Sequence, residues 1–97
     1  MVAALPNSIS GRAVASQIAR SGTSVGANYR AARRARSNRE FVAKLGVVEE
    51  EADETAFWLE IIIEDKMLPA DKVEPLLDEA NQIVAIIVKS KQTARKK

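Results

Sequence analysis

The sequence predicts an all-α protein, an antiparallel up-and-down helical bundle with three long helices. The main observation is a heptad seam within residues 37–66, which is typical of a helix packed lengthwise against other helices. The seam follows steps of 4 and 3 through Phe41, Leu45, Val48, Ala52, Thr55, Leu59 and Ile62. Similar steps recur within residues 14–32 and 73–88, and the prolines, at positions 6, 69 and 75, lie near the expected helix boundaries.

Composition bounds both the size and the chemistry of the protein. The 97 residues have room for one domain, residues 1–97, and an apolar fraction of 46% suffices for a modest core that helices share. The sequence has no cysteine or histidine, which excludes disulfides, thiolate nucleophiles, histidine acid–base pairs and His/Cys metal sites. We therefore expect a cytoplasmic protein with no cofactor and no small-molecule substrate. No apolar run is long enough to suggest a membrane partner.

Charge is distributed in three blocks along the chain. Residues 1–48 contain eight basic and one acidic residue, residues 49–79 contain two basic and twelve acidic residues, and residues 80–97 contain five basic residues and no acid. Two basic blocks flanking an acidic one suit antiparallel helices that attract each other. The same pattern leaves basic surface available for a polyanion.

The first residues resemble the end of one helix and the start of the next. Met1 to Leu5 fit the last turn of a helix that is otherwise missing, and Pro6 stops it. Asn7, Ser8 and Ser10 offer N-caps for the following helix.

The next expected helix has a small and polar seam. Its members are Val14, Ile18, Ser21, Val25, Asn28 and Ala32. Gly22 and Gly26 each cost roughly 1 kcal/mol of helix propensity relative to alanine, so we expect close packing there to offset the cost, or a bend. Asn28 is predicted to be a buried structural amide that fixes the register by hydrogen bonding across the seam, with ligand contact as the alternative.

A basic segment joins this helix to the next one. Its candidate nucleic-acid-binding residues are Arg30, Arg33, Arg34, Arg36 and Arg39. The first three share a face of the helix's last turn, where positive charge also complements the helix dipole. A solvated helix end that pairs with nearby acids is one interpretation, and phosphate binding is the other. Tyr29 is the one aromatic residue interleaved with these arginines as a possible stacking group.

The helix predicted over residues 37–66 begins at a capping box and carries apolar residues outside its seam. Ser37 and Glu40 have the spacing of that box. The additional apolar residues, which we predict to form an oligomer interface, are Val47, Phe57, Trp58 and Ile61. Exposed aromatic patches of this kind are uncommon on soluble monomers, so a helix that is apolar on more than one side is either central in its bundle or also buried against another subunit.

The same helix carries a run of acids that includes the structural polar candidates Glu51 and Glu54. Carboxylates three residues apart resemble the ligands of dimetal carboxylate bundles, but the histidines of those sites are missing. We expect these two glutamates to be half-buried ion-pair partners for Arg20, Lys44 or an arginine of another subunit. Metal binding is the alternative.

The last helix is expected to follow Pro69. Asp71 and Glu74 form a candidate capping pair, with Pro75 in the first turn. The apolar seam then runs through Val73, Leu76, Ala80, Ile83 and Ile87. From about residue 90 to residue 97 the chain is basic and is expected to fray into a tail.

Several of these motifs together resemble the four-helix-bundle proteins known as 23S rRNA-intervening-sequence proteins. The resemblance spans about Leu5 to Thr93. It rests on the run from Arg20 to Arg30 (RSGTSVGANYR), then Ser37, Glu40-Phe41, Lys44-Leu45, Glu50 to Thr55 (EEADET) and Trp58-Leu59-Glu60. Members of that family have a full helix before the Leu5-Pro6 turn, so the resemblance implies that the first helix is largely missing here.

The resemblance also implies a ring-like homopentamer. It further implies relatedness to the accessory variability protein of diversity-generating retroelements, a basic pentameric bundle that works with a reverse transcriptase and its RNA. We therefore expect a non-enzymatic, homo-oligomeric scaffold that binds structured RNA, or another nucleic acid, through phosphate contacts. Two alternatives stay open. One is a protein–protein interaction module whose arginines pair with acids of neighbouring subunits, and the other is a carboxylate metal-binding bundle.

Overall fold

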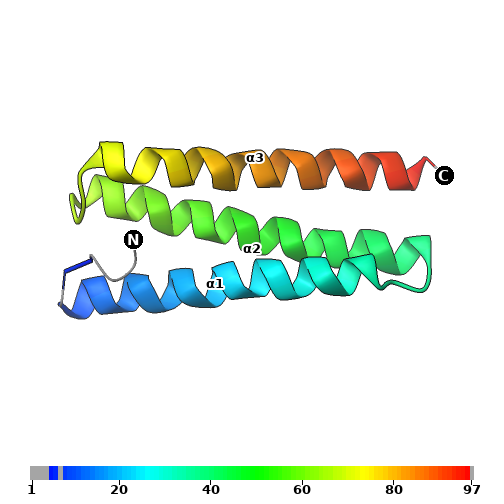
Figure 1. Cartoon of the computed structure of the whole chain (residues 1–97), viewed down its shortest axis with the longest axis horizontal. Helices are drawn as coiled ribbons and strands as arrows, with labels where there is room; N and C mark the ends of the chain where they lie inside the picture. The colour runs from blue at the N-terminus through cyan, green and yellow to red at the C-terminus, as the bar shows by residue number, and fades with distance from the viewer. Residues whose placement is uncertain (1–4, 7, 97) are drawn as a thin grey trace.

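The protein is all-helical, as the seams predict. The structure, a computed structural model, describes residues 5, 6 and 8–96, which form α1 (Ile9–Arg33), α2 (Asn38–Glu64) and α3 (Ala70–Arg95) and no strand. Consecutive helices run antiparallel, and the bundle measures 47 × 20 × 14 Å (Figure 1). The helical turn expected for Met1 to Leu5 falls mostly outside the described residues.

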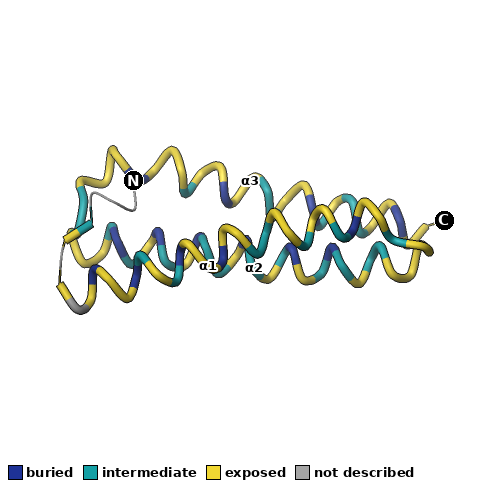
Figure 2. The backbone as a smooth tube through the Cα atoms, turned by 60° about the horizontal axis from the view of Figure 1, so that its bottom comes forward, coloured by how far each residue is buried: buried dark blue, intermediate teal, exposed yellow. Residues whose placement is uncertain are grey.

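Helix α2 lies between the other two helices. It packs against both α1 and α3, whereas no Cα atom of α1 lies within 8 Å of one of α3. Figure 2 shows buried positions recurring along each helix, and they form two core clusters. One cluster contains Val14, Ile18, Ala56, Leu59, Ile62, Val73 and Ala80. The other, toward the α1–α2 loop, contains Ala32, Leu45, Val48 and Ile87. The open side between α1 and α3 leaves α2 as the floor of a shallow groove.

Helix α1 begins after Ser8, one of the N-cap residues that the sequence predicts. The Ser8 Oγ accepts a hydrogen bond from the Gly11 backbone N–H at 3.0 Å. A Cβ atom at Gly11 would lie only 2.0 Å from the Pro6 carbonyl oxygen, so the chain can approach the helix this closely only because residue 11 is glycine.

The polar contact across the α1–α2 seam involves Ser21 and not Asn28. Ser21 is fully buried at 0% exposure, and the Thr55 Oγ1 donates a hydrogen bond to its Oγ at 2.8 Å. The Asn28 Nδ2 instead donates to the carbonyl and the Oγ of Ser24, at 2.9 and 3.1 Å, within its own helix. The prediction that Asn28 bonds across the seam is therefore wrong, because a residue one turn earlier satisfies the amide.

Gly22 and Gly26 of α1 do not mediate close packing against the other described helices. A Cβ atom placed on Gly22 or Gly26 would meet nothing within 4 Å among the described residues. Both residues are exposed. The expectation that close helix contact offsets their cost is not met by α2 or α3.

Helix α2 follows the predicted seam closely. The Ser37 Oγ accepts a hydrogen bond from the Glu40 backbone N–H at 3.1 Å, as the capping box predicts. Leu45, Val48, Ala52, Leu59 and Ile62 are buried, together with Ala56 beside the seam. The helix ends at Glu64, slightly before the expected residue 66, and the chain turns at Lys66, whose φ is 54°.

Helix α3 is longer at both ends than the sequence suggests. It begins at Ala70 with Pro69 at the N-cap and no capping side chain, so Asp71 lies in the first turn instead of capping it, and Pro75 lies inside the helix. The predicted frayed tail is helical to Arg95, because Ala94 is buried and its carbonyl oxygen accepts a 2.6 Å hydrogen bond from the Asn38 Nδ2. None of the described helices is long and apolar enough to cross a lipid bilayer.

Candidate nucleic-acid interface

The arginines predicted to bind nucleic acid gather where α1 passes into α2. Arg30 and Arg33 occupy the last turn of α1, Arg34 is its C-cap, and Arg39 follows in the first turn of α2. Arg36 lies in the loop between the two helices. All of them are exposed, and none forms an ion pair with any residue that the structure describes.

Two hollows bring most of these side chains together. The first, of about 470 Å³, is lined by Gly26, Tyr29, Arg30, Arg33 and Arg34. The second, of about 770 Å³, is lined by Ala27, Arg30, Ala31, Arg34, Arg36, Glu40 and Lys44. Arg30 and Arg34 belong to both hollows, so the two form one continuous basic surface, which we call the arginine face.

Lys44 belongs to the arginine face, although its position in the sequence suggests a different partner. It was a candidate partner of the α2 acids, but its side chain lines the second hollow with Arg34 and Arg36. Lys44 lies five residues after Arg39 in sequence. Only the turn between α1 and α2 brings it beside the end of α1, which a linear pattern of charges does not reveal.

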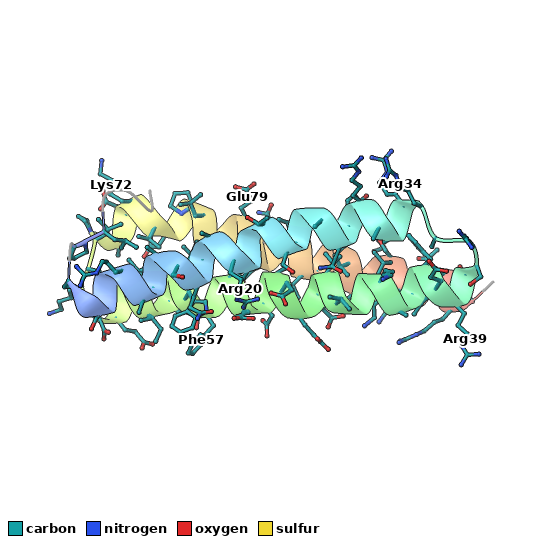
Figure 3. All side chains as sticks on the ribbon, turned by 90° about the horizontal axis from the view of Figure 1, so that it is seen from below. Arg20, Arg34, Arg39, Phe57, Lys72 and Glu79 are labelled. Carbon is teal, nitrogen blue, oxygen red and sulfur yellow. The ribbon has the colours of Figure 1, made fainter. Side chains whose placement is uncertain are left out.

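Arg39 does not join the arginine face. Figure 3 shows Arg34 and Arg39 near the same end of the molecule but pointing to opposite sides. Arg39 also lines neither of the two hollows. The predicted five-residue cluster is therefore divided into four arginines on one face and one on the other.

Three acidic residues of α2 form ion pairs with cations of α1 and α3. Arg20 of α1 pairs with Glu51, at 3.3 Å between Nη1 and Oε2, and with Glu54 through a hydrogen bond from Nη2 to Oε1. Lys91 of α3 pairs with Glu49 at 2.6 Å between Nζ and Oε1. The predicted ion pairing of Glu51 and Glu54 with Arg20 is thus confirmed, and these pairs lie away from the arginine face.

The Arg20–Glu54 pair affects the titration of both groups. A hydrogen bond from Arg20 lowers the pKa of Glu54 below its ordinary value, and the same hydrogen bond raises the pKa of Arg20. The Trp58 indole N–H also donates to the Glu54 carboxylate, at 3.5 Å, which lowers the pKa of Glu54 further. Both effects favour the charged forms.

No three acidic side chains in the described part of the chain come together as metal ligands.

The residues predicted to form an oligomer interface divide into two pairs. Trp58 and Ile61 are partly buried and pack against the core cluster that contains Leu59. Val47 and Phe57 remain exposed on the outer side of α2, Phe57 at 51%, and the Phe57 and Trp58 rings form a T-shaped pair with a centroid distance of 5.1 Å. Phe57 and Val47 therefore leave apolar surface of α2 uncovered, and Tyr29, Leu76 and Ile86 are exposed as well.

Comparison with known proteins identifies relatives of the whole bundle. The model of the family described as 23S rRNA-intervening sequence protein matches residues 2–89. A Bacteroides thetaiotaomicron crystal structure, of a protein with unknown function from the S23 ribosomal protein family, is 35% identical and has a TM-score of 0.77. The match covers 80% of this chain and 72% of that one. No curated protein matches the sequence. From the matched residues and the shared helical fold, we conclude that this chain belongs to the 23S rRNA-intervening sequence protein family.

Proposed function

We propose that the protein is a non-enzymatic, homo-oligomeric helical scaffold that binds RNA through phosphate contacts with its arginine face. The observation that carries the proposal is the contrast between paired and unpaired charges. Arg20 and Lys91 are matched to acids of α2, whereas Arg30, Arg33, Arg34 and Arg36 have no acidic partner among the described residues. A cluster of unpaired guanidinium groups produces the positive potential that is typical of a polyanion-binding site.

The geometry of the arginine face suits contact with a phosphate backbone better than recognition of base edges. Its two hollows are open depressions beside the end of α1, and neither contains an Asn or Gln side chain that would read base edges. Arginine forks bind phosphate oxygens in pairs. We therefore infer that charge and shape contribute more to recognition than sequence does.

Self-association would strengthen the binding of RNA by the arginine face of a single subunit. Val47 and Phe57 on the outer side of α2 supply an apolar surface, and the family resemblance suggests a ring of five subunits. Each copy would carry one arginine face, and linked copies bind a long polyanion with an effective concentration far above that of a free subunit. The proposed location of this assembly is the cytoplasm.

The alternative is a protein–protein module in which the arginines pair with α2 acids of a neighbouring subunit. Three of those acids, Glu49, Glu51 and Glu54, already have partners in their own chain. Within the acidic run of residues 49–54, Glu50 and Asp53 are exposed and form no ion pair with any described residue. The pairing of the other three glutamates within the chain supports RNA as the partner of the arginine face.

The test replaces Arg33 and Arg34 together by glutamine and measures binding of a fluorescein-labelled hairpin RNA at several salt concentrations. We expect affinity to fall by roughly ten-fold, and the slope of log K against log salt to become shallower by about 2, because two phosphate contacts are lost. Glutamine removes charge without adding an acid at the end of α1, so the helix dipole is not opposed.

A matched control replaces Lys66 and Lys72 by glutamine. Both are exposed, and Lys72 lies at the opposite end of the bundle from Arg34 (Figure 3). The control has the same net charge as the test variant and should retain the wild-type salt slope. Equal losses in the two variants would contradict a localised site. Loss of the oligomer in the arginine variant, measured by light scattering, would favour the protein–protein alternative.

A further inference from the structure

Tyr29 lies at the border between the arginine face and an apolar groove. Its side chain is 46% exposed and lines the same hollow as Arg30, Arg33 and Arg34. It also lines the groove between α1 and α3, a depression of about 280 Å³ whose other lining residues are Val25, Gly26, Val48, Ile83, Ile86 and Ile87. Tyr29 is therefore the aromatic side chain that adjoins the unpaired arginines.

The helical register places this ring beside a guanidinium group. Tyr29 and Arg33 are separated by four residues on α1, so their side chains project from the same face of the helix. Arg30 and Arg34, which line the same hollow, supply further positive charge next to the ring. A planar group lying against Tyr29 would thus have guanidinium groups within reach of any phosphate attached to it.

Gly26 lines the hollow without adding a side chain to it. It lies three residues before Tyr29, about one turn earlier, and lines both depressions that Tyr29 lines. A Cβ atom at Gly26 would meet nothing within 4 Å among the described residues other than its two chain neighbours, so the space beside Gly26 is open. The hollow of about 470 Å³ falls within the usual size range of small-ligand sites, which is roughly 300–1,000 Å³.

We propose that this hollow is a subsite for one unpaired nucleotide, whose base stacks on Tyr29 while its phosphate contacts Arg33 and Arg34. The inference rests on the proposed RNA-binding function and narrows it to single-stranded segments, such as loops. Bases within a duplex are already stacked on their neighbours, whereas an unpaired base is free to stack on an aromatic side chain. Arginine beside the ring adds a further stacking surface for the base.

The experiment compares a single-stranded oligouridine with a blunt RNA duplex of equal length, using wild type, Tyr29→Ala and Tyr29→Phe. We expect Tyr29→Ala to weaken oligouridine binding by roughly ten-fold and to leave duplex binding unchanged, and Tyr29→Phe to bind both as the wild type does. Ile86→Ala is the matched control, since it removes an exposed side chain from the other wall of the groove and should change neither affinity. The protein has one tyrosine, so its ring resonances report stacking at this site alone.

The possible results separate this inference from the proposal on which it rests. If Tyr29→Ala binds oligouridine as the wild type does, while Arg33→Gln/Arg34→Gln still weakens RNA binding, the stacking subsite is overturned and the arginine face stands. If Tyr29→Ala weakens binding of oligouridine and of the duplex equally, or changes the number of subunits, Tyr29 acts in packing and the proposed subsite is also overturned. If the wild type binds neither probe, the proposed function itself fails.

Discussion

Ile62→Ala is expected to lower the free energy of unfolding by about 3 kcal/mol. Ile62 is 0% exposed and lies in the core cluster that joins all three helices, with Val14 from α1 and Val73 from α3. Truncation removes buried methyl and methylene groups and leaves a cavity, since the surrounding helices relax only partly. Urea denaturation followed by the far-ultraviolet signal measures the loss.

Ile86→Ala is the matched control for this prediction. The same atoms are removed from a side chain that is 62% exposed, on the wall of the groove between α1 and α3. The free energy of unfolding should change by well under 1 kcal/mol. A loss at Ile86 as large as that at Ile62 would contradict the account, because it would mean that the groove is covered in the folded protein.

Replacing Gly22 and Gly26 together by alanine is expected to stabilise the protein by about 2 kcal/mol. Each glycine in a helix interior costs about 1 kcal/mol relative to alanine, and neither added methyl group would meet a neighbour within 4 Å among the described residues. Thermal and urea unfolding of the double variant measure the gain.

Gly11→Ala gives the opposite control, because its Cβ atom would lie 2.0 Å from the Pro6 carbonyl oxygen and should destabilise the start of α1. If the Gly22/Gly26 double variant instead lost stability or subunits, another helix or subunit would have to pack closely on that face. The prediction of an open glycine face would then be wrong.

The apolar seams could be predicted from sequence because they depend on local periodicity. The positions Leu45, Val48, Leu59 and Ile62 recur at heptad spacing, and burial of one face follows directly from that spacing. The start of α2 was equally predictable, because a serine three residues before a glutamate satisfies a backbone N–H locally.

Side-chain hydrogen bonds could not be predicted where a residue had more than one possible partner or a partner distant in sequence. Asn28 had hydrogen-bond partners available both across the seam and one turn earlier, and the structure uses Ser24. The heptad pattern predicts Ser21 only as a small residue of the seam, although its hydroxyl accepts the hydrogen bond from Thr55. The end of α3 depends on Asn38 of α2 meeting the Ala94 carbonyl, and residues this distant in sequence give no common pattern.

The candidate site could be predicted only where its residues lie on one helix. Arg30, Arg33 and Arg34 share a face through their spacing on α1, and the structure groups them as expected. Arg39 turns to the other side because α2 begins a new helix after the loop, and Lys44 joins the arginine face through that same turn. Helix periodicity predicts neighbours within a helix, whereas the geometry of the loop determines neighbours across it.

The central claim is that the protein is an oligomer that carries RNA on its arginine faces, and native mass spectrometry of the gently purified protein tests it most directly. One spectrum reports the number of subunits and any nucleic acid that co-purifies. The account predicts a homo-oligomer, a pentamer by family resemblance, with additional heterogeneous mass that ribonuclease removes. A bare monomer that does not acquire mass when RNA is added would contradict it.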